Sequence, residues 1–138
     1  MDFLSNTQII VTTANIATLL FAVVIVLQLL LAAGILPVSM AWGGRQSVLT
    51  PALRVSSLIA AILLGAFIVV IRTRAGLTGN APIPGFILVA SWMITAFMAF
   101  NTLGNLASKS VKEKLVFGPI TLLLTLACLL ISASRLAG

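Results

Sequence analysis

Charged residues are few along this chain, and they separate four long uncharged stretches, at 3–44, 55–71, 75–108 and 115–134. An α-helix needs about 20 apolar residues to cross a hydrocarbon core of about 30 Å. Each stretch reaches or approaches that length, and 19–27 and 58–71 are continuous apolar runs, whereas strands of a membrane barrel alternate polar and apolar residues. The pattern therefore predicts an all-α polytopic membrane protein, a four-transmembrane-helix bundle forming one membrane domain over 1–138.

The expected helices are bounded by polar residues, prolines and charges, and we place them at about 9–35, 52–71, 85–107 and 115–134. The first follows the polar residues 5–8 and is expected to end before Pro37, because the residue before a proline disfavours the helical conformation. Pro82 and Pro84, together with nearby glycines, predict a turn-rich connection between the second and third helices.

Two prolines mark the expected starts of the second and fourth helices. Thr50 suits an N-cap and Pro51 the first turn, where the missing N–H costs nothing. The charged residues of 109–114 are expected to form a compact loop, so that the fourth helix begins near Leu115 or Pro119. The short segments before the two prolines are similar, which fits either a duplicated hairpin or the general preference of proline for helix starts.

Composition agrees with a membrane location. The chain has 7% charged and 61% hydrophobic residues, with a mean hydropathy of +1.26, whereas a soluble domain carries about 25% charged residues. The first apolar run lacks the basic leader and cleavage site of a signal peptide, so the first helix is expected to be retained. We expect a multi-pass protein of the cell membrane, in contact with membrane lipids and with other membrane proteins or further copies of itself.

The net charge of +6 comes from eight basic and two acidic residues. The basic residues lie beside the expected spans, where they anchor the chain to lipid headgroups, so binding of nucleic acid is not expected. The first and third loops contain five of them: Arg45, Arg54, Lys109, Lys112 and Lys114. The second loop and the tail contain three: Arg72, Arg74 and Arg135. The positive-inside rule therefore places both termini outside the cytoplasm.

Small side chains recur every four residues on two of the expected helices, at Ser57, Ala61 and Gly65 on the second and at Ala14, Thr18 and Ala22 on the first. Small residues allow helices to approach closely in a bilayer, so we expect these two faces to pack together. A large residue at Gly65 is then expected to be disruptive. The alternative is that these small residues line a pore.

The third expected helix is the most polar. Together with Met98, its polar residues follow the i, i+4, i+7, i+11, i+14 pattern of a single face: Ser91, Thr95, Thr102 and Asn105. Asn101 lies one turn before Asn105, and Gln28 of the first helix is expected to face the same surface. This face should point inward, either to form interhelical hydrogen bonds or to provide a polar ligand site or permeation path.

The residues needed for catalysis are scarce. An enzyme needs a nucleophile with a base, a metal-binding cluster or paired carboxylates, but the chain has no His, no Tyr, one Cys and two acidic residues. We therefore expect no enzymatic activity, no cofactor and no metal. Arg54 is expected either to extend to the headgroups or to pair with Glu113 across the loops. Proton-coupled export is disfavoured because no carboxylate is expected within a span.

The last third of the chain contains Asn-Thr-Leu-Gly-Asn-Leu-Ala-Ser from Asn101, followed by Glu113 and Pro119 and preceded by Trp92. This order resembles small bacterial four-span integral membrane proteins of unassigned function. The resemblance implies a cell-membrane location and a bundle fold, and it brings no catalytic residues. Two function classes remain: a structural or accessory protein that binds membrane partners or lipids through its helix faces, and a small oligomeric channel or uncoupled transporter with a path along the third helix.

Overall fold

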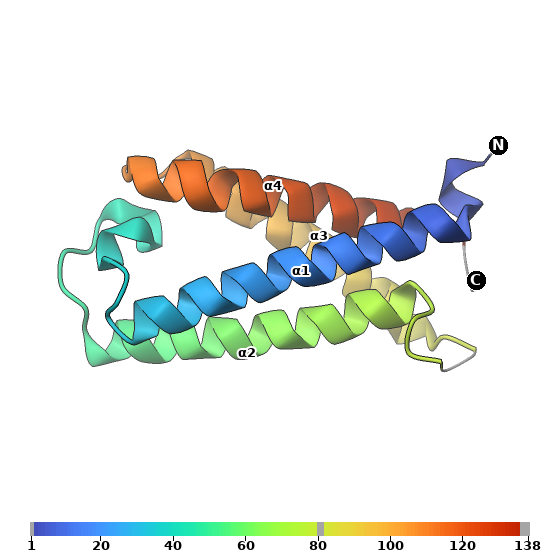
Figure 1. Ribbon diagram of the computed structural model, residues 1–138, viewed down its shortest axis with the longest axis horizontal. Helices are drawn as coiled ribbons and strands as arrows, with labels where there is room; N and C mark the ends of the chain where they lie inside the picture. Colours follow the sequence, from blue (N-terminus) through green and yellow to red (C-terminus); the bar gives the residue numbers. More distant parts are fainter. Residues whose placement is uncertain (1, 80–81, 136–138) are drawn as a thin grey trace.

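The computed structural model describes residues 2–79 and 82–135, and it confirms the predicted fold class. Four helices are long and apolar enough to cross a membrane: α1 (Thr7–Ala32), α2 (Pro51–Arg74), α3 (Gly85–Leu106) and α4 (Val111–Ala133). Figure 1 shows them as an elongated bundle in which the start of α1 and the end of α4 lie at the same end. Three short 3₁₀ segments are also present, at Phe3–Ser5, Val38–Met40 and Trp42–Gly44. The chain is thus a multi-pass membrane protein.

The bundle is built from two hairpins. α1 packs along α2 and α3 packs along α4, while α1 also contacts α4. α2 and α3 contact each other less extensively than the members of each hairpin do. The largest fully buried side chains come from all four helices and include Phe21 of α1, Ile71 of α2, Met98 of α3 and Leu124 of α4. The core therefore lies between the four helices, and the junction of α2 with α3 is the more open one.

α1 begins and ends earlier than expected. Asn6 caps its start, because the Asn6 side chain accepts a hydrogen bond from the Ile9 N–H at 3.2 Å. Its end is set by Gly34, which has a φ of 78°. The Gly34 N–H donates to the Leu31 carbonyl and the Ile35 N–H to the Leu30 carbonyl, which is the Schellman arrangement. The glycine therefore ends the helix before Pro37 has any effect.

α2 continues past the expected end at residue 71. Gly76 has a φ of 77°, and the Leu77 N–H donates to the Arg72 carbonyl at 2.9 Å, so a second Schellman motif ends the helix. Arg72 and Arg74 consequently lie in the last helical turn, where cations interact favourably with the negative end of the helix dipole.

α4 begins at Val111, earlier than the expected start at Leu115 or Pro119. Ser110 and Glu113 have the spacing of a capping box, and the Ser110 hydroxyl accepts from the Glu113 N–H at 3.2 Å. The charged residues therefore form the first turn of α4, and Pro119 lies inside the helix. Because Pro51 is the first residue of α2, the two prolines occupy different positions in their helices, which removes the main support for a duplicated hairpin.

The first loop folds onto the third. The Lys109 N–H donates to the Gly43 carbonyl at 3.1 Å, and Gly44 adopts a φ of 71° with its α-carbon close to Ser110. A Cβ at position 44 would lie 2.6 Å from the Ser110 nitrogen, so only glycine fits there. This contact brings the segment around Trp42 over the start of α4.

Candidate functional site

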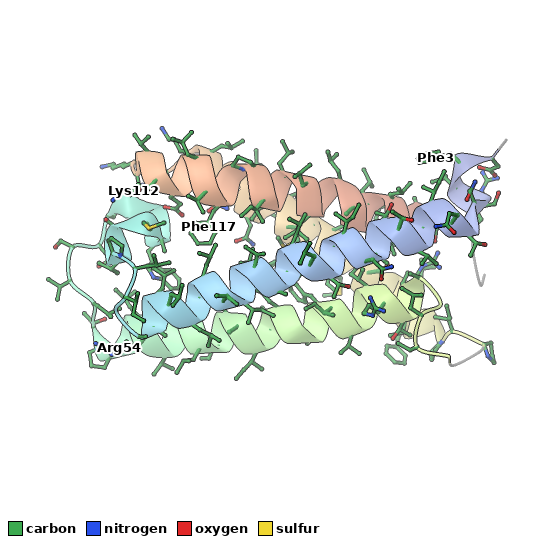
Figure 2. All side chains as sticks on the ribbon, in the orientation of Figure 1. Phe3, Arg54, Lys112 and Phe117 are labelled. Carbon is green, nitrogen blue, oxygen red and sulfur yellow. The ribbon has the colours of Figure 1, made fainter. Side chains whose placement is uncertain are left out.

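The bundle contains a cavity of about 470 Å³ at the end where the first and third loops meet. All four helices and the first loop contribute to its lining. Its polar residues are Gln28, Asn101, Asn105, Glu113 and Thr121. Apolar residues, among them Val24, Leu64, Phe97, Met98 and Phe117, line the deeper part. Figure 2 shows Phe117 pointing from α4 into the space between the helices.

The cavity opens between α2 and α3. Among its lining residues, Leu63 of α2 and Phe97, Phe100 and Gly104 of α3 are exposed on the outer surface of the bundle. Phe117 from α4 and Val24 from α1 are buried and form the opposite wall. In a bilayer the opening would face the acyl chains, because α2 and α3 are membrane-spanning segments.

Three aromatic rings close the apolar end of the cavity. Phe97 lines the cavity and packs edge-to-face on Phe67, with ring centroids 5.4 Å apart. Phe67 packs in the same manner on Phe21 at 6.1 Å. This row crosses α3, α2 and α1, and edge-to-face contacts of this kind are favourable beyond simple burial. The rings separate the cavity from the half of the bundle near the termini.

The predicted polar face of α3 lies against α4. Thr95 shares a hydrogen bond with Ser132, and Thr102 shares one with Thr125, each at 3.1 Å. The Asn105 amide donates to the Thr121 hydroxyl, also at 3.1 Å. The structure thus places most of this face in interhelical hydrogen bonds. Sequence reasoning missed the partner face on α4, although its hydroxyl residues at 121, 125 and 132 have helical spacing.

The remaining polar residues on the predicted face differ from these. Ser91 is buried but donates to the Leu88 carbonyl of its own helix. Asn101 donates to the Phe97 carbonyl, one turn earlier in α3. Gln28 of α1 lines the same cavity as Asn101 and Asn105 of α3. Its buried Oε1 accepts no hydrogen bond from the described residues. Asn101, Asn105 and Gln28 are therefore brought together as cavity-lining groups.

Glu113 is buried, with 5% of its surface exposed, and it lines the cavity. The Ser108 hydroxyl donates to its Oε2 at 2.6 Å, and the Ser110 N–H donates to the Ser108 hydroxyl at 3.0 Å. In a capping box the glutamate side chain accepts directly from the backbone N–H of the N-cap residue. Here the Ser108 hydroxyl bridges the Ser110 N–H and the Glu113 carboxylate. Glu113 was expected in a loop, but it belongs to the first turn of α4.

Arg54 and Glu113 do not form the hypothesised pair: no ion pair joins them in the part of the chain that the structure describes. Figure 2 shows Arg54 at the same end of the bundle as Lys112 but on a separate helix, across the bundle. Arg54 is exposed on the first turn of α2, whereas Glu113 is directed inward by its bond to Ser108. The arrangement of Arg54 agrees with an extended, surface-directed side chain.

The predicted small-residue faces are only partly in contact. Ala14, Ser57 and Ala61 are buried, but Ala22 is exposed and Gly65 is half-buried. A Cβ at Gly65 would meet no atom within 4 Å, so the described chain provides no close contact to support the expectation that a large residue there is disruptive. The buried residues of α1 follow a spacing of three and four rather than four throughout, which turns Ala22 away from α2.

Two arginines near the other end of the bundle join helices. Arg72 donates to Asn15 at 3.0 Å and to Thr18 at 3.2 Å, so Thr18 is a hydrogen-bonding rather than a packing residue. Arg74 is buried and donates to the backbone carbonyls of Ser132 and Ser134 at the end of α4. From the sequence, both residues were expected only to anchor the chain to lipid headgroups.

Residues with metal-binding chemistry do not gather within 2–79 and 82–135, and Cys128 is a buried free thiol. The cavity has an apolar wall, a polar end and one carboxylate. No protein-family description matches the chain, and neither a curated protein nor a solved structure matches it.

Proposed function

We propose that this chain is a non-enzymatic accessory protein of the cell membrane that binds a lipid-like molecule in the cavity between α2 and α3. The observation that carries the proposal is the position of the cavity mouth. Leu63 and Phe100 border the mouth and are exposed on membrane-spanning helices. A molecule that is already dissolved in the bilayer could enter there without crossing water.

The form of the cavity supports an amphiphilic ligand. Its deep wall is apolar, and its other end has amide groups and the Glu113 carboxylate beside the loop that contains Trp42. Such a combination of a largely apolar surface with a few polar groups is typical of small-molecule sites. An amphiphile lying parallel to the helices would place its head at the membrane surface and its chain among the buried residues.

The alternative, a channel or uncoupled transporter with a path along α3, has less support. The polar face of α3 is occupied by hydrogen bonds to Ser132, Thr125 and Thr121. The contacts among Phe21, Phe67 and Phe97 lie across any path that continues from the cavity toward the termini. Flux of a small solute through purified protein in liposomes, at a rate above that of empty liposomes, would favour the channel.

The binding proposal is tested by filling the mouth. Gly104 lines the cavity and a Cβ there would meet no atom within 4 Å, so Gly104→Trp should occupy the opening without displacing backbone. Gly65→Trp is the matched control, because Gly65 has equally open space and does not line the cavity. The measurement is cross-linking of a photoactivatable single-chain lipid in liposomes, mapped to individual residues.

In the unaltered protein we expect cross-links at Leu63 and Phe100 to exceed those at Val69, which is exposed on α2 outside the cavity. Gly104→Trp should remove the excess and Gly65→Trp should leave it unchanged. Equal labelling of the three positions in the unaltered protein would show that the cavity does not bind the lipid and would refute the proposal.

A further inference from the structure

The side chains at the polar end of the cavity have unused hydrogen-bond acceptors. Asn101 and Asn105 each donate through the amide nitrogen to a protein oxygen, on Phe97 and Thr121 respectively. Neither amide oxygen receives a hydrogen bond within the described ranges, and the same holds for the buried Oε1 of Gln28. The Gln28 Oε1 is the buried acceptor among them, and a hydrogen-bond donor on a ligand would satisfy it.

Glu113 adds a negative charge to this set. Its Oε2 accepts from Ser108, whereas its Oε1 receives no hydrogen bond from any residue that the structure describes. No Lys or Arg nitrogen among the described residues forms an ion pair with it. Its place in the first turn of α4 favours a negative charge through the helix dipole, and Oε1 is available to a donor from a ligand.

We infer that the cavity binds a cationic amphiphile, namely an ammonium group on an apolar chain. This inference rests on the proposed binding function of the same cavity. The ammonium would donate to Glu113 and to the free amide oxygens, and the chain would lie against the apolar wall beside Val24 and Phe97. A volume of about 470 Å³ suits a small single-chain molecule. An anionic headgroup would instead meet the Glu113 carboxylate.

The positions of the two tryptophans provide the measurement. Trp42 lines the cavity, whereas Trp92 is exposed on α3 and does not line it. Two single-tryptophan proteins, Trp92→Phe and Trp42→Phe, are reconstituted in nanodiscs of neutral phosphatidylcholine. Fluorescence quenching by chain-brominated dodecylamine is compared with quenching by equally brominated dodecanol. Because Trp92 does not line the cavity, its quenching measures the background from amphiphile that is dissolved in the lipid and not bound in the cavity.

We expect dodecylamine to quench Trp42 saturably and at lower concentration than dodecanol, with no such preference at Trp92. Glu113→Gln keeps the size of the side chain and an acceptor for the Ser108 hydroxyl. It should weaken binding of the amine about tenfold, or about 1.4 kcal/mol, because a neutral amide binds an ammonium less strongly than a carboxylate does. Asp2→Asn removes the same charge at the opposite end of the bundle and should leave the preference intact.

The quenching results distinguish a failure of the binding function from a failure of ammonium recognition. If neither amphiphile quenches Trp42 saturably, the proposed binding function fails, and the inference fails with it. If both bind equally, the cavity binds amphiphiles but does not recognise the ammonium. If Glu113→Gln retains the preference for the amine, Glu113 is not the group that recognises the ammonium, and the inference is refuted as well. Should Glu113→Gln not fold, the comparison of amine with alcohol in the Trp92→Phe protein still decides the inference.

An ammonium group on an apolar chain occurs in free alkylamines and in aminophospholipids. Nanodiscs that contain phosphatidylethanolamine separate these two sources. Loss of amine quenching in such discs, in proportion to the aminophospholipid present, would identify the lipid headgroup as the occupant. Unchanged quenching would identify a free amphiphile. Both results support ammonium recognition at Glu113.

Discussion

Ser108 is the residue that connects the polar end of the cavity to the start of α4. Its hydroxyl accepts from the Ser110 N–H and donates to Glu113, so a single side chain satisfies a backbone donor and orients the buried carboxylate. Neither contact follows from the local sequence, in which Ser110 and Glu113 alone have the capping-box spacing. Ser108 itself is 3% exposed although it lies in a connecting loop.

Ser108→Ala should lower the free energy of unfolding by about 1–3 kcal/mol, because it leaves a buried carboxylate oxygen and a backbone N–H without partners. Unfolding of the purified protein in mixed micelles measures the effect. Ser56→Ala is the control: the Ser56 hydroxyl bonds only to the Ala52 carbonyl of its own helix, and its loss should change the free energy by less than about 0.5 kcal/mol. Similar values for the two variants would show that the Ser108 contacts contribute little.

At the scale of helices, the glycine at which two helices pack closely is Gly118, and the small-residue spacing in the sequence indicates Gly65 instead. Gly118 is buried in α4, and a Cβ there would lie 3.1 Å from Cδ2 of Leu106. Gly65, the residue indicated by the small-residue spacing, has open space around its α-carbon. A spacing of four identifies a face of one helix but contains no information about which helix covers it or how closely.

Gly118→Leu should therefore be destabilising by about 1–3 kcal/mol, because the added side chain overpacks the contact between α3 and α4. Gly65→Leu should be neutral or stabilising, since leucine forms helix better than glycine by about 1 kcal/mol and its Cβ would meet no atom within 4 Å. Thermal unfolding of both variants in the same detergent provides the comparison. A larger loss at Gly65 than at Gly118 would contradict the packing of the bundle.

At the scale of the whole molecule, the two ends of the bundle are held by different means. At the loop end, the bond from Lys109 to Gly43 joins the first and third loops above the cavity. At the end with the termini, Arg74 of α2 binds the carbonyls that end α4, and Arg135 pairs with Asp2 at 2.8 Å. The exposed Arg135 pair contributes little to stability by itself. The cavity thus lies at the end where loop contacts rather than buried side chains close the bundle.

The start of α1 and the end of α4 share one end, so an impermeant thiol reagent should distinguish the two sides of the membrane. In a Cys128→Ala background, Ser5→Cys should react on intact cells, whereas Lys112→Cys should react only after permeabilisation, as the distribution of Lys and Arg predicts. The reverse result would invert the orientation and keep the four spans. Reaction of both positions from outside would contradict the membrane crossing between them.

The number of spans, their approximate positions and the sharing of one end by the termini follow from the sequence. Long apolar stretches require helices in a bilayer, where each helix satisfies its own backbone groups. The inward position of Thr95, Thr102 and Asn105 also follows, because a polar face avoids lipid wherever a neighbouring helix is present. The helix boundaries were less predictable, since Gly34 and Ser110 act through local hydrogen bonds that compete with the more visible prolines.

Only the tertiary structure decided which groups form the cavity. Gln28, Asn105 and Glu113 come from three helices, and they meet because α2 and α3 pack less closely than the other neighbouring pairs. Glu113 belongs to a charged cluster that any sequence pattern assigns to a solvated loop, yet its bond to Ser108 and the fold of the first loop over α4 bury it. Such an environment depends on contacts between residues distant in the chain, and no local periodicity encodes them.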